Sequence, residues 1–351
     1  MGLIVSILVL SFLIFFHELG HFLFARLFGV HVERFSIGFG KVIFSKVIGR
    51  TEYAISAIPL GGYVKMKGQD DADPTKISYD PDSYTVKPPW QRIMILLGGP
   101  FFNFLLAFFL YYAIALMGAN AYAPVIGMVQ PDSPAQEVGL QKGDKIIEIN
   151  NQPIKIWDDL SEAIHASHGT IEMLVDRNGT ILSVAVTPRI LEAKSIFGET
   201  VKRRMVGIAP LGEVVTLSYD PVKAISYAWE KTVDASKMII LSVEKLIEGV
   251  VPAKEMGGVI AIVQVTAEAS QHGLVALFAL TALISVNLGV LNLLPIPALD
   301  GGHIIFTLYE MTFRRPLNEE IIYRLTLGGW VLLLTLMAFT IYNDIARITN
   351  G

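Results

Sequence analysis

Residues 3–24, LIVSILVLSFLIFFHELGHFLF, decide the fold class of this chain. The stretch carries no charge before His17, and it reaches the length of about 20 residues that an α-helix needs to cross a bilayer. Three further apolar stretches of this kind lie at about residues 93–117, 274–296 and 325–343. A mean hydropathy of +0.52 and a charged fraction of 17% agree with them. The sequence therefore predicts a polytopic α-helical membrane protein with four transmembrane helices.

Composition and charge exclude several kinds of site and partner. The chain of 351 residues has no cysteine, so disulfides and thiolate metal ligands are excluded. Its formal net charge of −4 gives no reason to expect a nucleic-acid partner. No basic residue precedes the first apolar stretch and no small-x-small site follows it, so we expect a retained membrane helix and not a cleaved signal peptide.

The distribution of positive charge predicts the orientation in the membrane. Residues 26–87 contain nine Lys and Arg, and the short connection 298–324 contains Arg314, Arg315 and Arg324. The positive-inside rule places both connections in the cytoplasm. Both termini and the long segment 118–273 are then expected outside the cytoplasm.

The external segment is predicted to contain one compact α+β domain at residues 122–190. Asn178-Gly179 between two alternating stretches is a strong hairpin signal. The order of PDSPA at 131–135, GL at 139–140 and GDKI at 143–146 resembles a bacterial PDZ domain, a fold that binds extended peptides by strand addition. A spacer domain with an empty groove is the alternative. The groove residues that this resemblance implies are Val125, Ile126, Gly127, Leu160 and Ile164.

The rest of the external segment, residues 191–273, is expected to be an amphipathic helical and extended region. Residues 221–248 have apolar positions at helical spacing, and residues 257–262 are expected to be short and extended. Packing on the membrane surface or on the transmembrane helices explains both without any chemistry.

The five residues HELGH at 17–21 fit the pattern H-E-x-x-H. On a helix, residues four apart share a face, so His17 and His21 could bind one Zn²⁺ while Glu18 acts as a base toward water at the metal. An ionised group at the bilayer centre costs on the order of 3 kcal/mol, so three ionisable residues in this helix need a partner. The alternative is a helix end that already lies at the cytoplasmic interface, with wetted histidines.

A catalytic zinc needs a third protein ligand, and Asp300 is the candidate. It follows two prolines that interrupt the third apolar stretch. The predicted topology brings it to the same side of the membrane as His17 and His21. Two alternatives stay open: His303 is a rival ligand, and Asp300 could instead cap a helix before Gly301-Gly302.

HELGH at 17–21 and NLLPIPALDGG at 292–302 resemble the motifs of the site-2 protease family of intramembrane zinc metalloproteases. Within it, the bacterial branch typified by the regulator-of-sigma-E protease RseP is the most similar. Two further elements agree: YAISAIPLGGYVKM at 53–66, and GGP at 98–100 followed by Asn103. The resemblance implies a metalloendopeptidase of the bacterial cytoplasmic (inner) membrane with its active site near the cytoplasmic side.

The resemblance also implies roles for individual residues. His17, His21 and Asp300 would be zinc ligands and Glu18 the general base. Asn292 would contact substrate or stabilise the oxyanion, and Asn287 would line the same cleft. Residues 50–67 would form a membrane-re-entrant β-hairpin that offers an open strand edge to the substrate; an ordinary cytoplasmic hairpin is the alternative. The candidate edge residues are Ala57 and Ile58, or Gly62, Tyr63 and Val64.

The implied substrate is a single-span membrane protein, such as an anti-sigma factor already trimmed on its outer side, or a remnant signal peptide. One departure is that the best-known members carry two PDZ domains, whereas one is found here. Two other classes remain as rivals. The first is a membrane-anchored PDZ receptor with a structural or degenerate metal site, against which an intact Glu18 argues. The second is a metal or proton transporter, against which four spans and no visible repeat argue.

Overall fold

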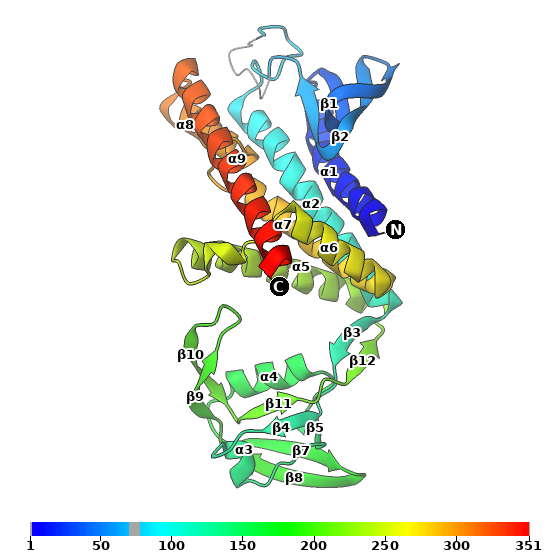
Figure 1. Ribbon diagram of the computed structural model, residues 1–351, viewed down its shortest axis with the longest axis vertical. Coiled ribbons are helices and arrows are strands. Elements are labelled where there is room, and N and C mark those ends of the chain that lie inside the picture. The colour runs from blue at the N-terminus through cyan, green and yellow to red at the C-terminus, as the bar shows by residue number, and fades with distance from the viewer. Residues whose placement is uncertain (1, 70–77, 351) are drawn as a thin grey trace. The chain divides into compact units, whose positions relative to one another are not determined.

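The computed structural model describes residues 2–69 and 78–350 and divides into two compact units (Figure 1). The first unit comprises Met1–Ile114, Val222–Leu246 and Pro252–Gly351. The second comprises Ala115–Pro221 and Ile247–Val251. The first unit contains the apolar helices and the second is rich in β-strands, and each is described by itself.

Within the described residues, four helices are long and apolar enough to cross a membrane. They are α1 (Gly2–Leu27), α2 (Pro89–Met117), α7 (Leu274–Asn292) and α9 (Glu319–Asn350). Three of them extend a few residues beyond the predicted stretches. The third ends at Asn292 and not near residue 296, because Pro295 and Pro297 cannot continue a helix. A helix that was not predicted, α8 (Asp300–Phe313), follows the break.

A close crossing of two glycines joins α1 to α2. A Cβ on Gly20 would lie 2.0 Å from the carbonyl oxygen of Gly98, and a Cβ on Gly98 would lie 2.7 Å from the carbonyl oxygen of Gly20. The two backbones can therefore approach only because neither residue has a side chain. This crossing lies one residue from His21 on α1 and one residue from Gly99 on α2.

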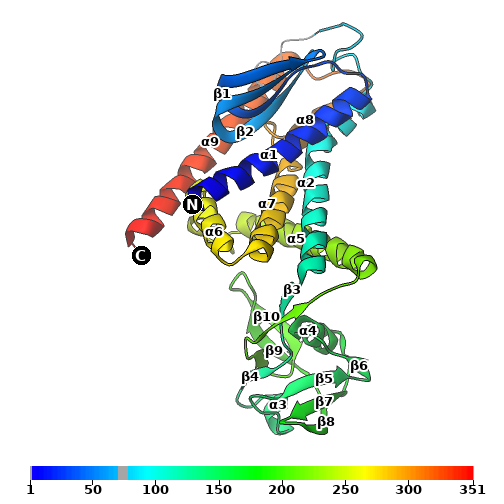
Figure 2. The ribbon, with the colours of Figure 1, turned by 90° about the vertical axis from the view of Figure 1, so that its right-hand side faces the viewer.

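A bent β-hairpin lies beside α1 (Figure 2). It consists of β1 (Val32–Ile48) and β2 (Thr51–Met66), so the predicted hairpin at residues 50–67 covers the second strand alone. The first strand was missed because Gly38 and Gly40, both with φ above +80°, break its alternating pattern where the strand bends.

The bend gives the hairpin the form of four paired segments. Residues 32–37 pair with 62–66 on one side and with 52–55 on the other, while 42–48 pair with 51–56. Residues 62–66 are therefore at an edge of the sheet. Phe35 of β1 packs edge-on against Phe15 and Phe22, which fixes the sheet on α1.

The remaining helices of the first unit are α5 (Pro221–Ile247), the short 3₁₀ helix η1 (Ala253–Glu255) and α6 (Val259–Gln271). The prediction of an extended segment at 257–262 is wrong, because α6 begins there. The carboxylate of Asp344 on α9 accepts hydrogen bonds of 3.0–3.1 Å from the backbone N–H groups of Gly258 and Ala261. A carboxylate at a helix N-terminus satisfies free N–H groups, and this one comes from a residue more than 80 positions away.

The second unit contains ten strands and two helices among its described residues. In chain order they are β3 (Ala119–Tyr122), β4 (Ile126–Val129), α3 (Pro134–Glu137), β5 (Lys145–Ile149), β6 (Gln152–Pro153), α4 (Trp157–Ala166), β7 (Ile171–Arg177), β8 (Thr180–Val186), β9 (Arg189–Lys194), β10 (Thr200–Met205), β11 (Ile208–Pro210) and β12 (Val214–Leu217). Its largest sheet has the order β6-β5-β7-β8. Leu160 of α4 and Met173 of β7 are fully buried in one core with Ile126 of β4.

The predicted domain boundary near residue 190 is too early. β11 pairs with β4, and β12 pairs with β3, so strands after residue 190 complete the sheets that begin the unit. Val206 is 1% exposed and belongs to the same core as Ile126. No local pattern in residues 191–217 indicates these pairings, because their partners lie about 80 to 100 residues earlier.

The predicted peptide groove required an open edge on the strand that carries Ile126. In the structure, β4 has partners on both sides. The backbone of Ile126 exchanges hydrogen bonds of 2.8 Å with the turn before β5, and β4 pairs with β11 on its other side. The prediction that Val125, Ile126 and Gly127 line an open groove is therefore wrong, and Leu160 and Ile164 of α4 are buried.

A buried ion pair stabilises the second unit. The side chain of Asp144 is 1% exposed and accepts two hydrogen bonds of 2.7 Å from Arg177 and one from the backbone of Gln141. Burial raises the pKa of Asp144, but the bonds from Arg177 and Gln141 lower it more, so that its pKa lies below the usual range. The ion pair therefore stabilises the fold above about pH 4 and is lost as the pH falls through the lowered pKa.

Asp144→Asn should lower the free energy of unfolding of this unit by about 2 kcal/mol at neutral pH, because Arg177 loses its charge-assisted hydrogen bonds. The difference from the unchanged protein should shrink below about pH 4. Hydrogen exchange in β5 and β7 of the full chain measures both effects. Glu137→Gln, which breaks the exposed pair with Arg189, is the control and should change the free energy by less than about 0.5 kcal/mol.

Candidate metal centre

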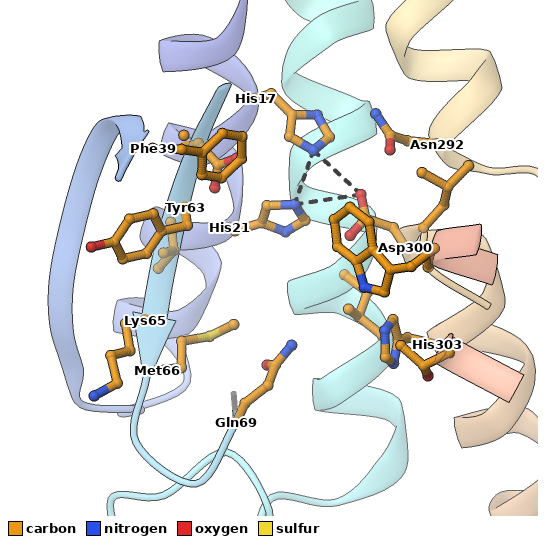
Figure 3. A pocket seen from close by; sticks show the side chains of 18 of the residues that line it. His17, His21, Phe39, Tyr63, Lys65, Met66, Gln69, Asn292, Asp300 and His303 are labelled. Carbon is orange, nitrogen blue, oxygen red and sulfur yellow. Dashed lines mark hydrogen bonds and ion pairs between the residues drawn. The ribbon is translucent and has the colours of Figure 1, made fainter. Parts of the chain in front are cut away.

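Three side chains from two distant segments converge in the first unit. His17 and His21, one turn apart on α1, face Asp300 at the start of α8 (Figure 3). The Nε2 atoms of the two histidines are 3.2 Å apart, and each lies 3.4 Å from Oδ2 of Asp300. The structure thus brings together the three residues that were predicted as metal ligands.

The geometry of these three atoms fits a zinc ion. A tetrahedral zinc with ligand bonds of about 2.0–2.1 Å places its ligand atoms about 3.3 Å apart. The observed separations are 3.2, 3.4 and 3.4 Å. In addition, Oδ2 of Asp300 is buried without a hydrogen-bond partner, which is costly unless a cation or another donor completes the site. Two imidazoles and one carboxylate form a donor set that suits catalytic zinc.

The break between α7 and α8 positions Asp300. The chain folds back tightly here, so that a Cβ on Gly301 would lie 2.3 Å from the carbonyl oxygen of Leu294. A Cβ on Gly302 would lie 2.3 Å from that of Ile296. The two glycines after Asp300 are therefore required by the fold of the loop. Asp300 is the first residue of α8, but its carboxylate turns toward the histidines.

The N-terminal half of α2 supports the two imidazoles. Nδ1 of His21 lies 2.8 Å from the carbonyl oxygen of Ile95, and Nδ1 of His17 lies 3.0 Å from the side-chain amide of Asn103. Between them, a Cβ on Gly99 would lie 2.4 Å from Nε2 of His21. The GGP element and its following asparagine thus lie directly against the metal ligands.

A cavity of about 650 Å³ opens beside the three ligands. Glu18 lines it, half-buried, and a Cβ on Gly62 of β2 would lie 3.0 Å from Cγ of Glu18. The strand edge and the candidate base are therefore in direct contact. Asn292 lines the opposite side of the cavity and donates a hydrogen bond of 3.0 Å to the carbonyl of Leu288.

The cavity separates the predicted site residues into two groups. Gly62, Tyr63 and Val64 line it, as do Asn292 and the rival ligand His303, which lies outside the three-ligand group. Of the residues predicted for the metal centre and its substrate cleft, Ala57, Ile58 and Asn287 do not line it.

One wall of the cavity was not predicted. It comes from α9 and consists of Tyr323, Thr326, Leu327 and Trp330. In the sequence these residues belong to an apolar stretch and its flank, and no motif distinguishes them from residues that face lipid. Lys65 and Met66 at the end of β2 continue the predicted edge and also line the cavity, as does Gln69 in the segment after β2.

Comparison with known proteins agrees with this site. The model of the family described as Peptidase family M50 matches residues 5–336. A Campylobacter jejuni protein named "Putative zinc metalloprotease" is 48% identical over 343 residues, which cover 98% of this chain and 93% of that protein. A Helicobacter pylori protein, also named as a "Putative zinc metalloprotease", is 41% identical over 98% of this chain and 99% of its own length.

Solved structures match a smaller part of the chain. The PDZ domain of an SdrC-like protein from Listeria innocua is 21% identical, covers 25% of this chain and 92% of its own, and has a TM-score of 0.21. Its counterpart from Listeria monocytogenes is 22% identical over 24% of this chain and 84% of its own, with a TM-score of 0.20. The predictions of a zinc cofactor and of metallopeptidase activity are confirmed by the family match together with the His-His-Asp site. The chain belongs to Peptidase family M50, and it is a multi-pass membrane zinc metalloprotease of that family.

Proposed function

We propose that this protease cleaves single-span membrane proteins within or beside their transmembrane segment, as implied by its resemblance to the RseP branch. The observation that carries the proposal is the position of the metal centre. Two of its ligands belong to an apolar helix, and the cavity beside them is lined by the edge of a β-strand. Anti-sigma factors trimmed on their outer side and remnant signal peptides are the substrate types that we propose.

The proposed orientation places the metal centre near the cytoplasmic side of the inner membrane. It rests on the positive charge of segments 26–87 and 298–324, which flank the site in sequence. Both termini and the β-rich second unit then belong outside the cytoplasm. Within the first unit, His17 and His21 lie in the C-terminal half of α1, which supports a site away from the bilayer centre.

We further propose that the β1–β2 hairpin enters the membrane. Its outer segment exposes large apolar side chains, and Ile43 and Val47 are 72% and 67% exposed. Exposed apolar residues on neighbouring positions are costly in water and favourable against lipid. Lys46 between them is long enough to reach the polar interface while its alkyl stem stays in apolar surroundings.

Glu18 is the proposed general base. When bound, zinc supplies Lewis-acid chemistry that makes a peptide carbonyl more electrophilic and a water molecule more acidic. The Glu18 carboxylate takes a proton from the water that attacks the scissile carbonyl carbon, and it returns that proton to the nitrogen of the leaving amine. We propose that Asn292, which also lines the cavity, donates a hydrogen bond to the carbonyl oxygen as negative charge develops.

The substrate must be unwound and held extended before it can react. In a transmembrane helix every peptide carbonyl is hydrogen-bonded, so a protease has to replace those bonds. Residues 62–66 form the edge segment of the hairpin, and they line the cavity next to Glu18. We propose that the substrate adds to this edge as a β-strand, with residues 62–64 and not 57–58 in contact.

Disulfide trapping tests which edge is used, since the chain has no cysteine of its own. In a Glu18→Gln background, Val64→Cys should cross-link to a reporter with a single cysteine two residues from the scissile bond. Ile58→Cys, on a segment that does not line the cavity, is the matched control and should give several-fold less product. Equal trapping at both positions would exclude residues 62–64 as the specific edge.

The second unit is proposed to be a PDZ-like module that screens substrates by strand addition. Since β4 is paired on both sides, we propose that the substrate adds to its partner β11, on the side away from β4. Two hydrogen bonds connect the end of α4 to the strand that leads into β11. Nδ1 of His165 lies 2.8 Å from the carbonyl oxygen of Arg204, and the guanidinium of Arg204 donates to the carbonyl of Ser167.

The proposed function is tested with purified protein and a tagged single-span reporter in detergent. We expect one cut within or beside the reporter's span, mapped by mass spectrometry, which a zinc chelator abolishes and added zinc restores. A PDZ receptor would bind the reporter without cutting it. A transporter would move metal or protons across liposomes without any product.

A further inference from the structure

A buried asparagine with an incompletely satisfied side chain lies behind the metal centre. Asn103 on α2 is 0% exposed, and its Nδ2 lies 3.0 Å from Nδ1 of His17. Its Oδ1 is buried and has no hydrogen-bond partner. The backbone carbonyl of Asn103 accepts a bond of 2.8 Å from the hydroxyl of Ser285 on α7. A buried amide oxygen without a partner calls for a physical explanation.

The chemistry of the imidazole ring decides which amide atom of Asn103 faces His17. Nε2 of His17 is one of the three converging ligand atoms, so it must present a lone pair. A neutral imidazole with a lone pair on Nε2 carries its proton on Nδ1, which is then a donor and needs an acceptor. Rotating the side-chain amide of Asn103 by about 180° keeps its shape and brings its Oδ1 to Nδ1 of His17. The same rotation gives Oδ1 a donor and moves Nδ2 to the buried position where Oδ1 has no partner.

We propose that Asn103 is a positioning residue that accepts the Nδ1–H of His17 through Oδ1. The bond holds His17 in the tautomer and ring orientation that bind the metal. The inference rests on the proposed metal site but concerns a residue that is not itself a ligand. His21 has an equivalent acceptor in the carbonyl oxygen of Ile95, at 2.8 Å.

The spacing along α2 supports this assignment. Ile95, Gly99 and Asn103 follow one another at intervals of four residues, so they share one face of the helix. That face is turned toward His17 and His21, which are themselves four residues apart. Each histidine therefore has an acceptor from α2, and Gly99 leaves room for both rings between the two acceptors.

Zinc affinity, measured by competition with a chelator of known affinity, tests the proposal without any cleavage assay. Asn103→Leu keeps the size of the side chain but removes the acceptor, and it should weaken zinc binding 10- to 100-fold. Asn103→Asp keeps an acceptor oxygen and should bind zinc within about threefold of the unchanged protein. Ser285→Ala removes the neighbouring bond to the backbone of Asn103 and should leave zinc affinity unchanged.

The melting temperature of the zinc-free protein separates this role from simple packing. In the zinc-free protein, Asn103→Leu should be as stable as the unchanged protein, because it removes a buried polar group. Asn103→Asp should be less stable, because it buries a charge. The order of the two variants is thus reversed between zinc affinity and zinc-free stability. A packing role would instead lower both quantities in parallel.

Two results would overturn the proposal: unchanged zinc affinity in Asn103→Leu, or equal losses in Asn103→Leu and Asn103→Asp. The predicted pattern of zinc affinities in a protein that cleaves no membrane substrate would refute the proposed function and leave this inference standing. If the unchanged protein bound no zinc, the metal site and this inference would both fall.

Discussion

Replacing Glu18 with glutamine should reduce cleavage of a single-span reporter by at least about 100-fold while the bound zinc stays in place. Loss of a positioned general base costs about 10²- to 10⁴-fold in rate. Glutamine has nearly the same shape as glutamate but cannot take a proton, so the contact with Gly62 of β2 should be kept. The rate is measured on the reporter, and the zinc stoichiometry on the same purified sample.

Asp234→Asn is the control for this experiment, because Asp234 forms an exposed ion pair with Lys237 on α5, and neither residue lines the cavity. It should cleave at nearly the normal rate. Glu18→Gln with full cleavage and full zinc content would remove Glu18 from the proposed chemistry. A variant that loses its zinc would show instead that Glu18 is needed for the architecture of the site.

Asp300→Ala should lower zinc affinity by about 100-fold or more, since a ligand contributes at least as much as a residue that merely orients one. The carboxylate is also the negative charge of the donor set, and its Oδ2 lies 3.4 Å from both imidazoles. Zinc stoichiometry of the purified protein, with chelator competition where zinc remains, measures the loss.

His303→Ala is the matched variant, because His303 lines the same cavity but lies outside the group of three converging ligands. It should keep its zinc. If zinc were instead lost in His303→Ala and kept in Asp300→Ala, the third ligand would have been assigned to the wrong side chain.

The metal centre could be predicted because its parts are encoded locally. His17 and His21 are placed on one face by helical spacing alone, and the topology of the apolar stretches brings Asp300 to the same side of the membrane. The strand edge at residues 62–64 was predicted as one of two options, because a sequence does not show which segment of a bent strand lies outermost.

Other parts depend on partners that are distant in sequence. The start of α6 is set by Asp344, and the edge of β4 is covered by β11. The cavity wall from α9 depends on the orientation of four apolar helices about their own axes. In α9, residues that face the cavity cannot be told by residue type from residues that face lipid. Tertiary contact overrides local preference in all three cases.

The matching intervals of four residues on α1 and α2 constrain the length of both helices near the metal centre. An insertion or deletion of one residue in either helix between the paired positions would turn everything beyond it by about 100°. The two imidazoles would then no longer face both acceptors, and Gly99 would no longer lie beside the rings. Length variation among relatives should therefore be absent from residues 17–21 and 95–103.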